Sequence, residues 1–187
     1  MRILSNYVSL RIELLHVNPL IWRRLLVPAS ITLPDLHLAI QGAMGWTNSH
    51  LHQFDIDGTS YGEPDEYGEV KILPEQSKKL STALGKNVRE FLYQYDFGDN
   101  WQHRVVVEQT QKAHAAWSGP LCAEGERACP PEDIGGSHGY QEFLEAIADP
   151  EHDEHVQMLT WVGGIFDPEG FDINSANQRI SALLDAE

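Results

Sequence analysis

Four side chains that can do chemistry lie within the eight residues 96–103, namely Asp96, Asp99, Trp101 and His103. Two carboxylates and an imidazole at this spacing can act as general acid and base, or they can bind a cation. They can also be structural, since Asp suits a turn and a histidine on an apolar face is often a hydrogen-bonded core residue. The residue types favour the structural role, and the segment remains a candidate binding cleft.

The two cysteines of the chain, Cys122 and Cys129, form a second candidate together with the nearby acids Glu132 and Asp133. Zinc prefers thiolate and imidazole ligands, and structural zinc sites usually pair cysteines two to four residues apart. Six residues separate these two cysteines, which is a looser spacing. We predict a zinc site with Cys122, Cys129 and His103 as one alternative, and two buried thiols as the simpler one.

Two histidines, His50 and His52, share one face of an expected strand and could ligate one ion together. Phe54 and Ile56 lie on the same face, so partial burial is the simpler account. A meeting of His50, His52 and His103 in space would favour a site instead.

Three arginines, Arg11, Arg23 and Arg24, surround Trp22 on the first expected hairpin. Basic residues interleaved with an aromatic can contact nucleic acid. Arg23 and Arg24 point to opposite faces of the strand, however, so we expect ion pairs with the chain's own carboxylates. The complete candidate cleft comprises Asp96, Asp99, Trp101, His103, Glu132, Asp133, His50, His52 and Trp22.

The charge balance bears on the partner. The net charge is −15, and a strongly negative chain repels a nucleic-acid duplex. We therefore expect a protein or small-molecule ligand. No apolar run approaches the roughly 20 residues that span a bilayer, and the first residues lack the apolar core of a secretory signal. We expect no membrane association and a cytoplasmic location.

The elements that position these residues follow from periodicity. Alternating apolar residues over 8–16 and 21–27 predict a hairpin. A helix is expected from Thr32 to Gly45, and a strand over 50–56. The segment 57–73 is expected to be a loop with at most one short strand.

A second hairpin, 91–97 with 101–107, is the clearest in the chain. A three-residue loop, 98–100, would pair Phe97 with Trp101 and Tyr95 with His103 on one apolar face. The segment 112–136 is rich in proline and glycine and is expected to be irregular.

Three helices are expected in the C-terminal third, the second of them beginning at Asp149-Pro150. These elements predict the α+β class, with a mixed sheet of hairpins and helices packed on one face. The first elements, in the order ββαβ, resemble a β-grasp arrangement. We expect one domain over 1–187, in which 1–110 is mainly sheet plus one helix and 137–187 is helical.

Four ordered blocks, with a tail, resemble the plasmid pRiA open-reading-frame-three-like family across nearly the whole chain. The blocks are Pro19-Leu20-Ile21-Trp22-Arg23-Arg24, Ala43-Met44-Gly45-Trp46 with His50-Leu51-His52, Tyr95-Asp96-Phe97-Gly98-Asp99-Asn100-Trp101-Gln102-His103, and Ala128-Cys129-Pro130-Pro131-Glu132-Asp133 with Gly135-Gly136 and Gly139-Tyr140; the tail is Gly163-Gly164-Ile165-Phe166-Asp167-Pro168.

The resemblance implies an α+β protein of plasmids or mobile elements, some of whose relatives are labelled insertion-element passenger proteins with a resolvase-like name. Many relatives have a third cysteine at the position of Ile134, so a site of three thiolates does not carry over to this chain. Two functional hypotheses remain. The first is a non-enzymatic binding or accessory module. The alternative is a metal-dependent hydrolase of a small or phosphorylated substrate, with ligands or bases among Asp96, Asp99, His103, Glu132 and Asp133.

Overall fold

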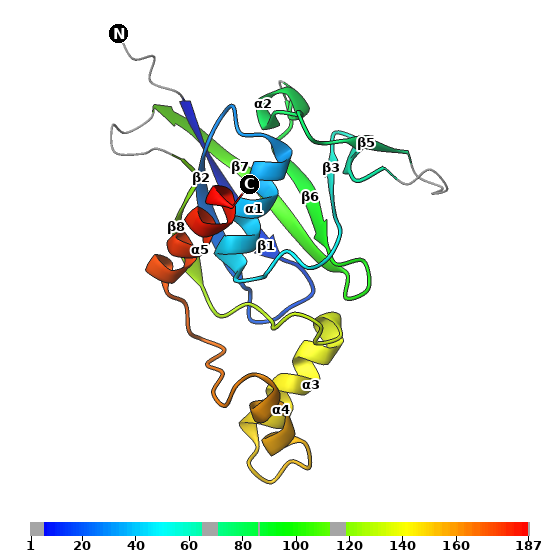
Figure 1. Cartoon of the computed structure of the whole chain (residues 1–187), viewed down its shortest axis with the longest axis vertical. Helices are drawn as coiled ribbons and strands as arrows, with labels where there is room; N and C mark the ends of the chain where they lie inside the picture. Colours follow the sequence, from blue (N-terminus) through cyan, green and yellow to red (C-terminus); the bar gives the residue numbers. More distant parts are fainter. Residues whose placement is uncertain (1–5, 65–70, 86, 113–118, 187) are drawn as a thin grey trace.

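The computed structural model describes residues 6–64, 71–85, 87–112 and 119–186, and these form an eight-stranded mixed sheet with helices packed on it (Figure 1). The strand order is β5-β4-β3-β6-β7-β1-β2-β8, and the pairs are antiparallel except β4 with β5. The strands are β1 (Asn6–Leu14), β2 (Trp22–Pro28), β3 (His52–Ile56), β4 (Thr59–Gly62), β5 (Ile72–Pro74), β6 (Glu90–Tyr95), β7 (Trp101–Lys112) and β8 (Leu121–Glu126). The helices are α1 (Leu33–Met44), α2 (Leu80–Ala83), α3 (Gly136–Ala148), α4 (His155–Trp161) and α5 (Ile173–Asp185).

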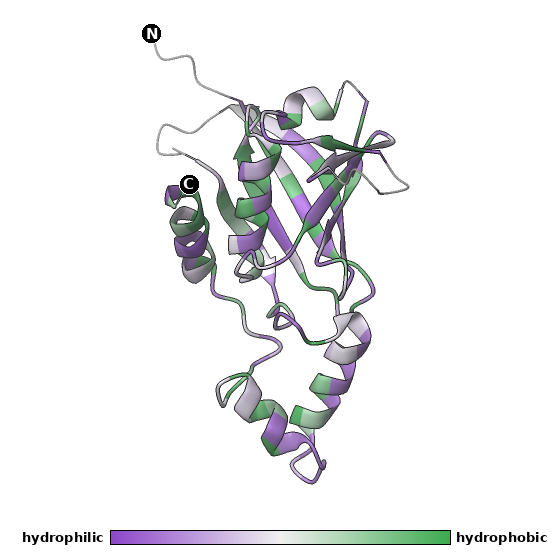
Figure 2. Cartoon of the chain, turned by 45° about the vertical axis from the view of Figure 1, so that its right-hand side comes forward, coloured by the Kyte–Doolittle hydropathy of each residue, from purple (hydrophilic) through white to green (hydrophobic). Residues whose placement is uncertain are grey.

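The first hairpin forms as the alternation predicts. Leu10, Ile12 and Leu14 of β1 are fully buried in the core, because every second side chain of a strand points to the same face. Figure 2 shows the same alternation as green and purple bands along the strands. β1 lies between β2 and β7, so its backbone is paired on both edges.

Helix α1 has the predicted ends. Thr32 caps its start by accepting a hydrogen bond from the Asp35 amide at 3.2 Å, and Gly45 ends it in the left-handed region with a φ of 97°. The helix contacts β2 and α5. At Gly42 a Cβ would lie 2.6 Å from the Ile180 nitrogen, so only glycine allows α5 to approach this closely.

The second hairpin differs from the prediction in its register. Tyr95 pairs with Trp101 and Tyr93 with His103, so the connection has five residues and Phe97 is 46% exposed. Asp96 adopts a left-handed conformation with a φ of 54°, and β6 ends at Tyr95, two residues before the predicted end at Phe97. A shift of two residues keeps every side chain on its face. The apolar face was therefore predicted correctly for Tyr93, Tyr95, Trp101, His103 and Val105, whereas the pairing and the inward position of Phe97 were wrong.

Two other predictions are corrected. The segment 112–136 contains the edge strand β8, although 113–118 lie outside the described residues. Gly125 weakens the strand pattern of the sequence, because glycine is rare within strands. Glycine is needed at this position because a Cβ would lie 2.8 Å from the Arg23 side chain and 2.9 Å from the Phe171 ring. In the segment 57–73, β4 and part of β5 form, and 65–70 lie outside the described residues.

Helix α4 begins at His155, later than the predicted Asp149-Pro150 start. The Asp149 side chain instead accepts a hydrogen bond from the Glu151 amide at 3.0 Å, which forms a turn. α3 and α4 pack on each other and project beyond one end of the sheet (Figure 1). The Ala128 amide donates to the Pro168 carbonyl at 3.0 Å and joins the two ends of this projection. No helix within the described ranges is long and apolar enough to cross a membrane.

Arg23 is a buried cation, 2% exposed, whose five N–H groups all have acceptors. It donates to one thiol sulfur and to four backbone carbonyls on three segments of the chain. The acceptors are Ala43 O at 2.9 Å, Trp22 O at 2.8 Å, Glu126 O at 2.8 Å, Arg127 O at 2.7 Å and Cys129 Sγ at 3.5 Å. The Phe171 ring lies 4.1 Å from the guanidinium carbon. The expected ion pair of Arg23 is therefore wrong, whereas Arg11 pairs with Glu13 and Arg24 with Glu108 and Glu124.

We expect Arg23→Lys to lower the free energy of unfolding by about 3–5 kcal/mol, because an ammonium keeps the charge but cannot reach the same acceptors. Arg24→Lys is the matched control: its ion pairs lie at the surface, and the loss should be below about 1 kcal/mol. Urea unfolding of both variants measures the difference. Equal losses would show that the buried carbonyl contacts contribute little.

Candidate functional site

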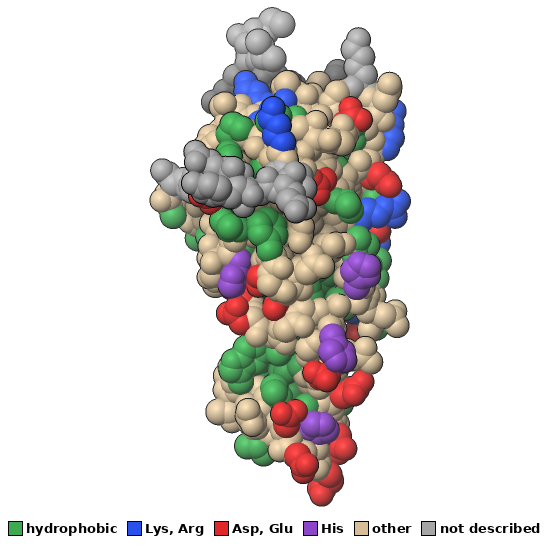
Figure 3. Space-filling view, turned by 90° about the vertical axis from the view of Figure 1, so that its right-hand side faces the viewer, with side chains coloured by type: hydrophobic (Ala, Val, Ile, Leu, Met, Phe, Trp, Pro, Cys, Tyr) green, Lys and Arg blue, Asp and Glu red, His purple; other side chains and the backbone are tan. Residues whose placement is uncertain are grey.

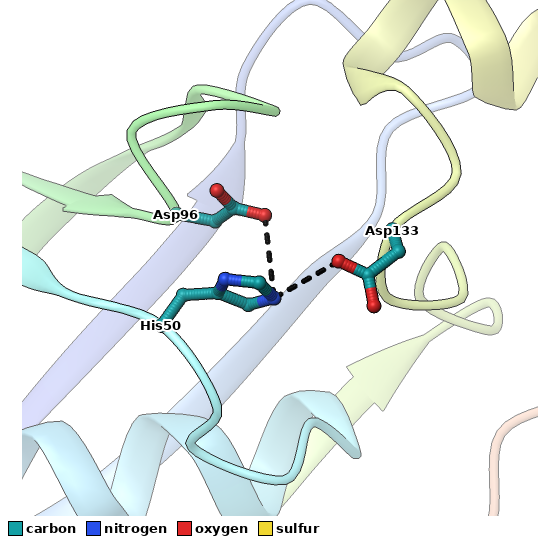
Figure 4. A group of neighbouring side chains, drawn as sticks. All are labelled: His50, Asp96 and Asp133. Carbon is teal, nitrogen blue, oxygen red and sulfur yellow. Dashed lines mark ion pairs between the residues drawn. The ribbon is translucent and has the colours of Figure 1, made fainter.

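Three side chains converge at one end of the sheet, His50, Asp96 and Asp133 (Figure 4). His50 precedes β3, Asp96 follows β6, and Asp133 lies in the loop before α3. His50 Nε2 lies 3.0 Å from Asp133 Oδ1 and 3.7 Å from Asp96 Oδ2. The three ligand atoms all lie within 4.8 Å of one another, so the group is close enough to share one cation.

Asp96 is held rigidly. It is 7% exposed, and its Oδ1 accepts hydrogen bonds from the amides of Gly98 at 2.9 Å and Asp99 at 3.3 Å. Its own amide donates to the Leu51 carbonyl at 2.9 Å. These bonds occupy one carboxylate oxygen and leave Oδ2 directed at His50 (Figure 4).

The loop that carries Asp133 is fixed against the second hairpin. The Gly135 amide donates to Asp99 Oδ2 at 3.1 Å, and a Cβ on Gly136 would lie 2.5 Å from the Asp99 carbonyl oxygen. The Trp46 indole donates to the Pro130 carbonyl at 2.9 Å. Asp99 is thus a turn residue that positions the loop, while the Asp133 side chain is 71% exposed.

Glu132 lies beside the three converging residues and binds a neighbouring tyrosine. Tyr95 donates its hydroxyl proton to Glu132 Oε1 at 2.5 Å, and the Thr47 amide donates to Glu132 Oε2 at 3.1 Å. Burial, with the Glu132 carboxylate next, raises the pKa of Tyr95 above its ordinary range. Tyr95 is therefore a phenol that donates to a carboxylate.

His52 belongs to a separate, inner cluster. Its Nε2 lies 2.9 Å from Glu75 Oε1, and its ring stacks on His37 at 3.5 Å with an interplanar angle of 5°. His37 in turn is hydrogen-bonded to the Tyr93 hydroxyl at 2.8 Å. Burial, with His52 next, lowers the pKa of His37 to about 3, so this ring is uncharged. His50 and His52 thus have different partners, Asp133 and Asp96 for the first and Glu75 and His37 for the second, and their sharing of one ion stays a prediction.

Trp101 and His103 lie in the core, at 1% and 0% exposure. His103 Nδ1 is 3.2 Å from the Tyr93 carbonyl, and burial lowers the pKa of His103 to about 4. The Trp101 indole N–H and His103 Nε2 have no hydrogen-bond partner among the described residues. Trp101 and His103 are thus buried side chains of β7, whereas Asp96 and Asp99 lie in the turn between β6 and β7.

Cys122 is a buried thiol and Cys129 a half-buried one. Cys122 donates to the Glu124 carbonyl at 3.4 Å, and burial raises its pKa to about 11. Cys129 contacts Met44 Sδ at 3.0 Å, and burial raises its pKa as well. Within the described ranges, one group of three metal-ligating side chains converges, and it comprises His50, Asp96 and Asp133. Zinc binding by Cys122, Cys129 and His103 stays a prediction.

Trp22 lies on β2, where its indole donates to Glu126 Oε2 of β8 at 3.1 Å. The Arg11 guanidinium carbon is 4.0 Å from its ring centre. Its contacts are thus with the β1–β2–β8 edge of the sheet. Sequence analysis did not single out Trp46 and Tyr95 as site residues; their rings stack at 5.1 Å, and both side chains bond to the loop. Both lie in the blocks that resemble the family, and that is the signal that could have singled them out.

The family model described as plasmid pRiA4b ORF-3-like protein matches residues 6–175. The chain belongs to this family. It is 40% identical over 181 residues to the uncharacterized protein y4hQ of Sinorhizobium fredii, covering 96% of this chain and 93% of that protein. It also resembles the crystal structure of a protein of unknown function, MM3350 of Methanosarcina mazei Go1, with a TM-score of 0.83 and 38% identity over 91% of this chain and 97% of that one. These relatives show the family and its fold, and no function is established by them.

The buried histidines predict an acid-sensitive fold. His37 and His103 have folded-state pKa values of about 3 and about 4, whereas an unfolded histidine has about 6.5. The unfolded chain therefore binds more protons between these values, and stability falls as the pH drops from about 6.5 towards about 4. We expect His103 alone to account for a loss of about 3 kcal/mol, measured by urea unfolding across this range.

His103→Gln should flatten this pH dependence, even though it lowers the stability at neutral pH. His138→Gln is the matched control, because His138 is 84% exposed and should leave the slope unchanged. The same slope in the His103→Gln variant and in the unaltered chain would contradict the assignment.

Proposed function

We propose that this family member is a non-enzymatic binding module that holds a divalent cation with His50, Asp96 and Asp133, and that it serves a plasmid or mobile element as an accessory protein. The observation that carries the proposal is the convergence of one imidazole nitrogen and two carboxylate oxygens from three separate segments. Imidazole and carboxylate ligands together suit zinc, manganese or iron.

The environment of His50 supports a cation. Its Nε2 is buried and makes no well-formed hydrogen bond within the described residues, although Asp133 Oδ1 is 3.0 Å away. A cation between these atoms would satisfy the nitrogen and both carboxylates together. Asp96 is already fixed by two backbone amides, so little order needs to be gained on binding.

The candidate nucleophiles of the chain support binding rather than catalysis. Both thiols are protonated, since burial raises the pKa of Cys122 and Cys129, and Tyr95 donates to Glu132. A nucleophile needs the opposite, a lowered pKa or an adjacent base. The family's link to plasmids rests on its name, which describes an open reading frame of a plasmid.

A metal-dependent hydrolase is the second candidate, and one observation favours it. Three protein ligands, one of them 71% exposed, leave coordination positions open to water, as in catalytic zinc sites. Hydrolysis of p-nitrophenyl phosphate or bis(p-nitrophenyl) phosphate by metal-loaded protein, abolished in Asp133→Asn, would support it. Cation binding without turnover of either substrate would leave the binding module as the better account.

We expect untagged, undialysed protein to contain about one divalent ion per chain, measured by plasma mass spectrometry, because all three ligands are in place. The apoprotein should then take up Zn²⁺ or Mn²⁺ in calorimetric titration. His50→Gln and Asp133→Asn should each weaken uptake at least about tenfold, since each removes one ligand. Affinity should also fall at lower pH, because ligands must be deprotonated to bind.

His138→Gln is the matched control, because His138 faces Glu142 at 3.4 Å on the exposed surface of α3 and forms no converging group of three. It should leave uptake unchanged. An unaltered protein that takes up no divalent ion, or uptake that survives both ligand substitutions, would overturn the proposal.

A further inference from the structure

The negative charge of the chain is concentrated in one segment. Between Arg127 and Arg179 the sequence has eleven Asp and Glu and no Lys or Arg, whereas the net charge of the whole chain is −15. This segment forms the loop before α3, the projecting pair α3 and α4, and the start of α5. On the face seen in Figure 3, acids gather at the lower end, over α3 and α4, while Lys and Arg lie mainly towards the other end.

An apolar cleft of about 300 Å³, lined largely by residues of this segment, lies between the end of α1 and the end of α4. Trp46, Pro131, Trp161 and Phe166 line it, with Glu132 at one side. The Trp161 ring packs edge-on against Phe143 at 6.4 Å, yet Trp161 remains 49% exposed. Val156 and Ile165, before and after it, are 73% and 89% exposed.

We propose that this cleft binds a basic amphipathic segment of a partner protein. An apolar side chain of that partner would enter the cleft against Trp161, and its Lys or Arg residues would face Glu132 and the other acids of the segment between Arg127 and Arg179. Tryptophan and charge complementarity at a rim are the features that give an interface its affinity and its rate of association. The charge selects the partner, because a nucleic-acid strand or a second copy of this acidic chain would be repelled.

The inference does not depend on the proposed cation. Cation binding uses His50, Asp96 and Asp133, whereas the cleft uses Trp161 and Phe166, with Glu132, which is not one of the three cation ligands, at one side. A protein without bound metal can therefore still bind the peptide, and a loss of one function would leave the other intact.

The test is calorimetric titration of the full chain with a short synthetic peptide that has Leu at helical spacing, one Trp and otherwise Lys. The same peptide with Glu for Lys is the charge control. We expect the basic peptide to bind, the acidic peptide to bind at least about tenfold more weakly, and the affinity to fall with added salt. A duplex DNA that binds more tightly than the basic peptide would overturn the proposal.

Trp161→Ala should weaken peptide binding about tenfold, because it removes the anchor of the cleft. Leu92→Ala is the matched control, since Leu92 is 45% exposed on β6, and it should leave affinity unchanged. Trp161→Phe keeps a ring in place and should retain most of the affinity, which separates loss of the contact from loss of folding. Equal affinity in the Trp161→Ala variant and the unaltered chain would overturn the cleft as the binding site.

A second set of variants tests the charge without touching the core. The triple variant E151Q/D153N/E154Q removes exposed acids before α4, and D57N/E63Q removes exposed acids on the β3–β4 side. The first should reduce both the affinity for the basic peptide and its salt dependence, and the second should change neither. An equal effect of both sets would show non-specific attraction and contradict a defined docking surface.

Discussion

The buried guanidinium of Arg23 is the interaction on which most of the molecule depends. An arginine cannot lose its proton, so its burial requires an acceptor for every N–H group. Here the acceptors are backbone carbonyls from the end of α1, from β2, and from the last residue of β8 and the residue after it, together with the Cys129 sulfur. The Arg23 guanidinium thereby fixes the position of the backbone at the end of β8, where the chain leaves the sheet. The loop that follows carries Glu132 and Asp133.

Three separate hydrogen bonds hold that loop at the candidate site. Asp99 accepts from Gly135, Trp46 donates to Pro130, and Tyr95 donates to Glu132. Each contact joins the loop to an element of the sheet or to the end of α1. The site is therefore assembled at the ends of strands by residues far apart in the sequence, and its rigidity comes from hydrogen bonds to the backbone.

Local signals explain how much could be predicted. The first hairpin and both ends of α1 follow from alternation and capping, which depend on near neighbours. The register of the second hairpin was missed because Asp96 adopts a left-handed conformation, and β8 was missed because packing against Arg23 requires a glycine there. All three residues of the converging group were named as candidates. Alternation cannot tell half-buried His50 from His52 and His103, because the environments of these histidines depend on long-range packing.

The contact between Ala128 and Pro168 closes the chain at the base of α3 and α4. Both neighbours of this projection, β8 and α5, belong to the main body, where Asn177 holds the backbone of Cys122. In topological terms the two helices are a long insertion whose ends meet. Such an insertion can be lengthened, shortened or given another charge without changing the strand order of the sheet.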